Sequence, residues 1–109
     1  MTEISAAELR QKIESREDIF IVDVRTEEEF KSGSLAGAVN LPLDKLRRGF
    51  SLSGSGISPD KETICICRGG IRSGEAARLL EKEGCRDVKI LKGGLLSWNC
   101  QQGEREGGI

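Results

Sequence analysis

The chain of 109 residues contains no histidine and no tyrosine, and it has only two prolines. Without histidine it cannot build a Ser–His or Cys–His catalytic pair, and it offers no imidazole to a metal ion. Aromatic residues make up 4% of the chain, and no block of basic residues is present. This composition argues against a surface on which nucleic-acid bases stack. Any nucleophile must therefore be activated by something other than imidazole.

Long apolar runs are also missing. The longest uninterrupted run of aliphatic or aromatic residues, Ile19–Val22, is far too short to cross a bilayer, and Met1–Ser5 lacks the basic-then-apolar pattern of a signal peptide. We therefore expect a cytoplasmic protein with no membrane contact. Its length predicts a single domain over residues 1–109, with a core from about 4 to 103 and a flexible tail at 104–109.

The four cysteines, at positions 65, 67, 85 and 100, show no C-x-x-C spacing. In a reducing compartment they are expected to be free thiols rather than a disulfide framework. Because histidine is absent, a zinc site would need unusually distant ligands, so we predict no metal site.

Apolar and polar segments alternate along the chain in a way that predicts strands and helices in turn. Capping boxes at Ser5–Glu8 and Thr26–Glu29 each indicate the start of a helix. Strands are expected at 18–24, 38–42, 63–66 and 88–91, and helices at 5–15, 26–33, 43–50, 74–84 and 95–102, with a mobile loop at 51–60. This order predicts an α/β fold, a parallel sheet with helices on both faces.

The most informative segment is Cys67–Ser73, between the expected strand at 63–66 and the following helix. It contains the nucleophile candidate Cys67 and the predicted substrate-binding residues Arg68, Gly69, Gly70, Ile71, Arg72 and Ser73. Two glycines allow a tight turn in which successive amides face one centre. The helix N-terminus and two arginines add positive charge, which favours a thiolate and would also hold an anion. An activated cysteine in such a loop is a catalytic arrangement.

Individual residues of this segment have more than one interpretation. Arg72 at a helix start is unfavourable unless an anion compensates its charge, which favours anion binding. Arg68 either points to solvent or steers anionic donors. Ser73 either caps the helix or bonds to the cysteine sulfur.

Outside this segment, structural roles are preferred. Asp23 and Arg25, near the end of the strand at 18–24, are expected to form an ion pair or turn bond that braces the site. The glutamates 27–29 are explained by helix capping and the helix dipole, so no chemistry is assigned to them. Gly93–Gly94 is interpreted as a tight turn and Trp98 as core packing.

Three segments in this order resemble a single-domain rhodanese, a sulfurtransferase, over about residues 4–103. The first contains Ile21–Arg25, Glu28–Phe30 and Gly37–Pro42; the second is the loop Cys67–Ser73; the third contains Val88, Leu91, Gly93–Gly94 and Trp98. The family often has a histidine and a proline where this chain has 33–37, and commonly a proline after its last helix. We expect only local consequences from the first departure, while the second leaves the conformation of the tail open.

The resemblance implies a rhodanese-like fold and transfer of sulfane sulfur through a Cys67 persulfide, without a cofactor. The implied partners are a small anionic donor such as thiosulfate, or a persulfide, and a thiol or protein-cysteine acceptor. Four residues separate Cys67 from Arg72, whereas the related phosphatases and arsenate reductases have five. The shorter loop favours sulfur transfer over that alternative. The other alternative is a binding or regulatory module with little turnover, which often lacks the cysteine.

Overall fold

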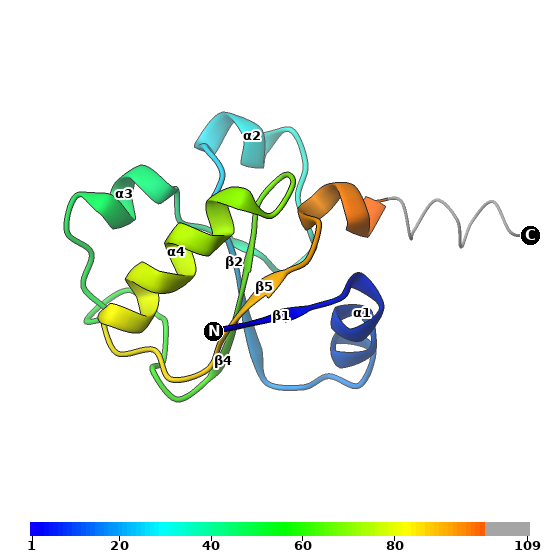
Figure 1. The fold of residues 1–109 in the computed structure, drawn as a ribbon, viewed down its shortest axis with the longest axis horizontal. Helices are drawn as coiled ribbons and strands as arrows, with labels where there is room; N and C mark the ends of the chain where they lie inside the picture. Colours follow the sequence, from blue (N-terminus) through cyan, green and yellow to red (C-terminus); the bar gives the residue numbers. More distant parts are fainter. Residues whose placement is uncertain (100–109) are drawn as a thin grey trace, which may run out of the picture.

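The computed structural model describes residues 1–99, which form an α/β fold (Figure 1). The strands are β1 (Thr2–Ile4), β2 (Ile19–Asp23), β3 (Val39–Asn40), β4 (Glu62–Ile66) and β5 (Val88–Leu91). The helices are α1 (Ala6–Glu14), α2 (Glu27–Lys31), α3 (Leu43–Arg47) and α4 (Ile71–Lys82), and residues 94–99 are also helical. No helix in this part of the chain is long and apolar enough to cross a membrane.

The strands form one five-stranded sheet in the order β1-β5-β4-β2-β3, and every neighbouring pair is parallel. The predicted parallel sheet is therefore confirmed. The central strands β2 and β4 pair along their full length, from Ile19 opposite Glu62 to Asp23 opposite Ile66. Since all strands run the same way, the residues that follow β2 and β4 meet at one edge of the sheet.

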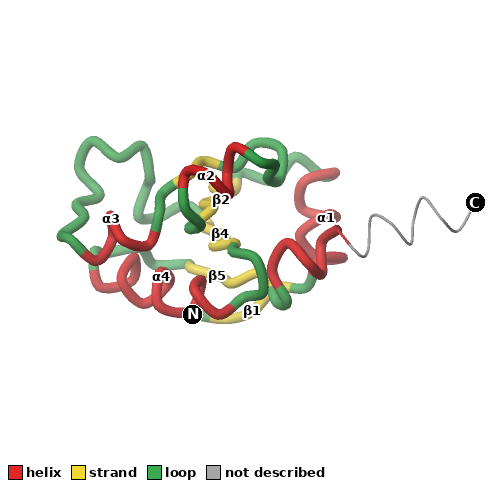
Figure 2. Tube along the Cα trace, turned by 90° about the horizontal axis from the view of Figure 1, so that it is seen from above, coloured by secondary structure: helices red, strands yellow, loops and turns green. Residues whose placement is uncertain are grey.

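Two apolar clusters form the core of the protein. Figure 2 shows α3 and α4 on one side of the sheet and α1 on the other. On β4 the side chains alternate, so Cys65 and Cys67 enter the cluster beneath α3 and α4, while Ile64 and Ile66 enter the opposite cluster. The second cluster also contains Leu9 of α1 and Trp98, which confirms core packing for that tryptophan. The alternation places the Cys67 side chain on the α4 side of the sheet.

The N-terminal half departs from the sequence prediction in two places. No strand was expected at Thr2–Ile4, yet β1 pairs with β5 at the edge of the sheet. Because only Ile4 of its three residues is buried, this segment shows no alternation of apolar and polar residues that would predict a strand. The helix expected at 43–50 ends at Arg47, because Gly49 turns the chain at a φ of +103°. Both capping boxes are present as predicted.

In the C-terminal half of the chain, α4 begins earlier than predicted, and this changes the description of the site. The helix expected to begin at Gly74 begins at Ile71, because Gly70 adopts a left-handed conformation with a φ of +101° and serves as the N-cap. Ile71, Arg72 and Ser73 therefore form the first turn of α4, and the loop proper is Cys67–Gly70. The predicted end of the last helix at 102 and the predicted tail at 104–109 lie outside the described residues.

Candidate active site

Cys67 directly follows β4 and sits under the first turn of α4. Its side chain is buried, with 1% of the residue exposed, and its Sγ accepts a hydrogen bond from the Gly70 backbone N–H at 3.0 Å. The left-handed Gly70 turns this amide back toward the sulfur, a conformation that side chains disfavour. The thiol thus faces a backbone donor and the positive end of a 12-residue helix, both of which stabilise negative charge on sulfur.

The Gly93–Gly94 turn supports this loop from behind. The N–H groups of Leu95 and Leu96 donate to the carbonyls of Cys67 and Arg68 at 2.8 and 3.0 Å. A Cβ on Gly94 would lie 2.5 Å from both carbonyl oxygens, so only glycine allows this approach. From the sequence, Gly93 and Gly94 were predicted only to form a tight turn. Their place between a strand and a helix, at the carboxyl edge of the sheet, is the signal that points to a contact with the Cys67 loop.

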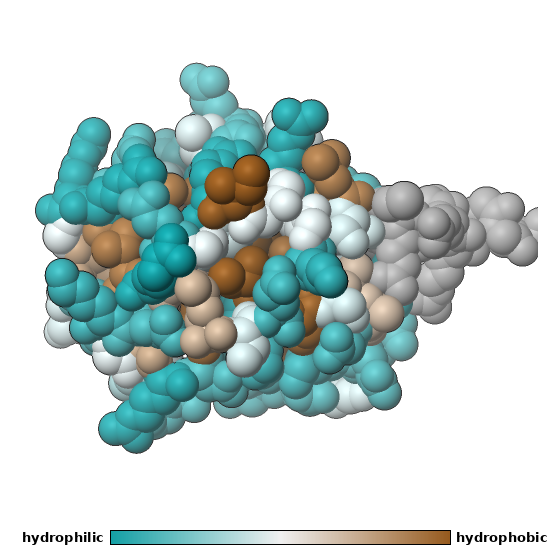
Figure 3. Space-filling model, in the orientation of Figure 1, coloured by the Kyte–Doolittle hydropathy of each residue, from teal (hydrophilic) through white to brown (hydrophobic). Residues whose placement is uncertain are grey.

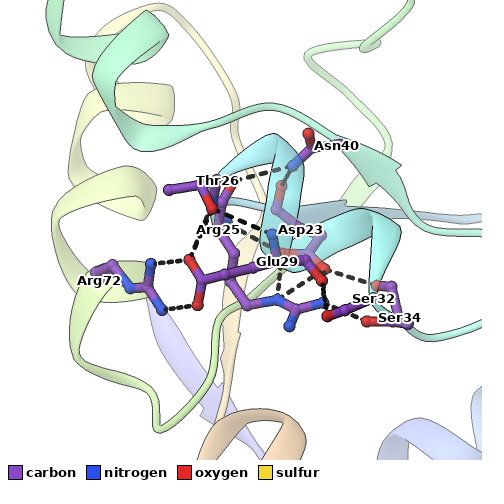
Figure 4. Close-up of polar contacts among 9 residues, drawn as sticks. Asp23, Arg25, Thr26, Glu29, Ser32, Ser34, Asn40 and Arg72 are labelled. Carbon is purple, nitrogen blue, oxygen red and sulfur yellow. Dashed lines mark hydrogen bonds and ion pairs between the residues drawn. The ribbon is translucent and has the colours of Figure 1, made fainter.

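Arg72 has a carboxylate partner that was not predicted. Its Nη1 and Nη2 donate to Oε1 and Oε2 of Glu29 at 2.6 and 2.9 Å, as Figure 4 shows. The hydrogen bonds from Arg72 lower the pKa of Glu29 to about 2, and the same carboxylate raises the pKa of Arg72. The charge at the start of α4 is thus balanced by a side chain of α2.

Asp23 and Arg25 form the expected ion pair, with Nη2 2.8 Å from Oδ2, and both are buried. Ser34 donates to the same Oδ2 at 2.6 Å, and Arg25 donates to the Gly33 carbonyl at 2.6 Å (Figure 4). The Asn40 amide bridges the carbonyls of Asp23 and Arg25. Since Val22 and Val24 pack in the Cys67 cluster, this alternation places the ion pair on the other face of the sheet. The ion pair connects β2 to the segment that follows α2. The sheet lies between this pair and the Cys67 thiol.

The remaining predicted residues of the segment point in different directions. Ile71 is 90% exposed, and Arg68 and Gly69 are also exposed. Figure 3 shows brown and white residues gathered near the start of α4, within a largely teal face. Ser73 is fully buried; it is not the N-cap, and among the described residues its hydroxyl has no partner, so neither predicted role is seen.

Cys65 and Cys85 are buried free thiols like Cys67. Burial raises the pKa of Cys65 to about 12 and also raises that of Cys85, so both stay protonated near neutral pH. Cys100 lies outside the described residues. Within residues 1–99, no three His, Cys, Asp or Glu side chains are grouped as a metal site requires.

Two cavities open beside the loop, one on each side of the sheet's carboxyl edge. The larger, of about 380 Å³, lies on the face of the Asp23–Arg25 pair and is lined by Arg25, Ser32, Gly33, Ser34, Arg68, Leu95, Leu96 and Asn99. The smaller, of about 220 Å³, is lined by Val24, Thr26, Pro42, Leu43, Asp44, Arg47 and Arg72. Cys67 lines neither. The smaller cavity is on the thiol's side, because its Val24 and Leu43 share a cluster with Cys67.

Comparison with known proteins shows the family to which the chain is similar. The Rhodanese-like domain family matches residues 5–101. The putative sulfurtransferase YtwF of Bacillus subtilis is 33% identical over 96 residues, which cover 88% of each chain. A sulfurtransferase of Allochromatium vinosum is 32% identical over 98 residues, covering 90% of this chain and 88% of that protein. The crystal structure of a rhodanese-like domain protein from Staphylococcus aureus superposes with a TM-score of 0.78 at 30% identity, covering 90% of this chain and 91% of that one.

Proposed function

This chain belongs to the rhodanese-like sulfurtransferase family, and on that premise we propose that it transfers sulfane sulfur through a persulfide on Cys67. The donor is thiosulfate or a persulfide, and the acceptor is a small thiol or a protein cysteine. One observation carries the proposal. The Cys67 sulfur accepts the Gly70 N–H at 3.0 Å beneath the N-terminus of α4, an arrangement that stabilises a sulfur anion.

Transfer takes place in two displacements. The Cys67 thiolate attacks the outer sulfur of thiosulfate; an S–S bond forms to Cys67, the donor's S–S bond breaks, and sulfite leaves with the bonding electron pair. An acceptor thiolate then attacks the outer sulfur of the persulfide and releases the Cys67 thiolate. The anionic outer sulfur is stabilised by the loop amides and the helix end between the two steps.

The burial of Cys67 supports a donor that presents a single outer sulfur atom. With 1% of the residue exposed, a bulky electrophile would have to displace the loop, whereas a terminal sulfur is narrow. The four residues between Cys67 and Arg72 support the same preference, because the related phosphatases use five to surround a tetrahedral oxyanion.

The test is mass spectrometry of the protein after incubation with thiosulfate, together with a thiosulfate-to-cyanide assay. We expect an adduct of about 32 Da on Cys67 that cyanide removes, and steady turnover. Cys67→Ser should fold, carry no adduct and show no transfer, because a serine oxygen cannot carry sulfane sulfur. Cys65→Ala is the matched control, since Cys65 is buried in the same cluster two residues earlier; it should retain most activity.

An adduct on another cysteine, or transfer by Cys67→Ser, would contradict the assignment. Folded protein with no adduct and no turnover, either with thiosulfate or with a persulfide of a small thiol, would favour the binding module. Efficient hydrolysis of an aryl phosphate without sulfur transfer would favour a phosphatase.

A further inference from the structure

Arginine charge at the loop is largely neutralised by carboxylates. Arg72 is paired with Glu29, and Arg47, which lines the same cavity, pairs with Glu75 at 2.7 Å and Asp44 at 3.3 Å. Among residues 1–99, Arg68 is the one arginine of the Cys67–Arg72 segment with no carboxylate partner. A donor approaching the thiol therefore meets far less positive charge than the two arginines of the sequence suggest.

The Glu29 carboxylate is fixed in place rather than free to swing away. Its Oε1 accepts from the backbone N–H and the hydroxyl of Thr26 as well as from Arg72, at 3.1, 3.2 and 2.6 Å, and its Oε2 binds Arg72. The contact from the Thr26 backbone N–H belongs to the capping box of α2. Local folding of α2 thus directs the carboxylate at Arg72, and an anionic donor that approaches this guanidinium meets the negative charge of Glu29 beside it.

We propose that Glu29 is a specificity-determining residue that disfavours doubly charged donors such as thiosulfate and favours donors of lower negative charge, such as persulfides of small thiols. The proposal rests on the proposed function and deepens it. Repulsion between the carboxylate and a second donor charge raises the KM for that donor, and the displacement on sulfur itself is unaffected. The depressed pKa of Glu29, about 2, keeps the carboxylate ionised throughout the physiological range.

Two donors that differ in charge but not in chemistry provide the test. Thiosulfate carries two negative charges, and methanethiosulfonate replaces one of its oxygens by a methyl group and carries one. Both give their outer sulfur to Cys67, releasing sulfite or methanesulfinate with the bonding electron pair. The measured quantity is the ratio of kcat/KM for thiosulfate to that for methanethiosulfonate.

Glu29→Gln should raise this ratio about tenfold, because it removes one partly screened negative charge from the pair that Glu29 forms with Arg72. The change should lie in the KM for thiosulfate. A glutamine oxygen can still accept from Thr26, so the capping box and the fold should persist. Glu28→Gln is the matched control, because it removes the same charge from the exposed neighbouring position of α2; its ratio should stay within twofold of the unmodified protein.

Two results would overturn the proposal. An unchanged ratio in Glu29→Gln would show that the carboxylate does not sense donor charge. An equal loss with both donors would show that it only supports the loop.

Sulfate, an unreactive dianion, separates this proposal from the proposed function. If the unmodified protein transfers sulfur from neither of these donors nor from a persulfide of a small thiol, the proposed function fails. Calorimetric titration with sulfate then still decides the role of Glu29: the proposal requires tighter binding by Glu29→Gln than by Glu28→Gln, and equal affinities reject it.

Discussion

At the scale of single residues, the buried pair of Asp23 and Arg25 is the group least able to lose a partner. Asp23 is fully buried and accepts from Arg25 and Ser34. Asp23→Asn would leave the buried guanidinium without its counter-charge, so we expect a loss of about 3–5 kcal/mol in the free energy of unfolding. Urea denaturation measures this loss.

Asp44→Asn is the control for that measurement. Asp44 also pairs with an arginine, but both side chains are more than half exposed. We expect a change within about 0.5 kcal/mol. Equal losses for the two variants would show that the buried pair does not brace the fold.

At the scale of secondary-structure elements, the Cys67 loop depends on the helix that begins at residue 94. Gly94→Ala would place a Cβ against the carbonyl oxygens of Cys67 and Arg68, at a φ of +61°. A left-handed alanine costs about 1–2 kcal/mol, and overpacking adds about 1–3 kcal/mol. We expect a lower urea midpoint and weaker sulfur transfer, because the loop carbonyls must move.

Gly54→Ala separates backbone strain from the clash. Gly54 has a similar φ, +79°, but a Cβ there meets nothing within 4 Å. Gly54→Ala should lose only the stability that a left-handed alanine costs, about 1–2 kcal/mol, and should keep full activity. If Gly94→Ala also keeps full activity and loses no more stability than Gly54→Ala, the contact of the Gly93–Gly94 turn with the Cys67 loop does not contribute to sulfur transfer.

At the scale of the whole molecule, ion pairs make stability depend on acid pH. The pKa of Glu29 is held near 2 by Arg72. Burial opposes ionisation of Glu62, but the ion pair with Lys89 at 2.6 Å and the hydrogen bond from Lys12 outweigh it and lower its pKa as well. These contacts link β4 to β5 and α1. Both folded-state values lie below the ordinary value of 4.5. The stabilisation is therefore complete above about pH 5 and is lost as the pH falls toward 2.

We expect the urea midpoint of the unmodified protein to fall between pH 5 and pH 2. The double variant Glu29→Gln/Glu62→Gln should be less stable at pH 7 and should show a shallower decline over the same range. Glu28→Gln should keep the original slope. If the urea midpoint of the double variant depends on pH as steeply as that of the unmodified protein, these two glutamates are not the cause of the loss of stability in acid.

Local chemistry was sufficient to determine much of this protein from its sequence. Capping boxes, apolar runs and glycines act over a few residues, so the helices α1 and α2, the parallel sheet and the strand–cysteine–glycine–helix order could all be predicted. The loop length is also a local property, and the family resemblance depends on three short segments and their order along the chain. Where a local signal was weak, as at β1, or ambiguous, as at the start of α4 between Gly70 and Gly74, the prediction missed.

Only the tertiary structure decided which charges meet. Glu29 and Arg72 are 43 residues apart, and nothing in either local sequence distinguishes a capping glutamate from one that also neutralises an arginine. The contact of Gly94 with the Cys67 loop likewise requires β4 and β5 to lie side by side. Pairings of this kind depend on strand order and on which face each side chain takes. These are properties of the assembled sheet, and here they set the electrostatics around the thiol.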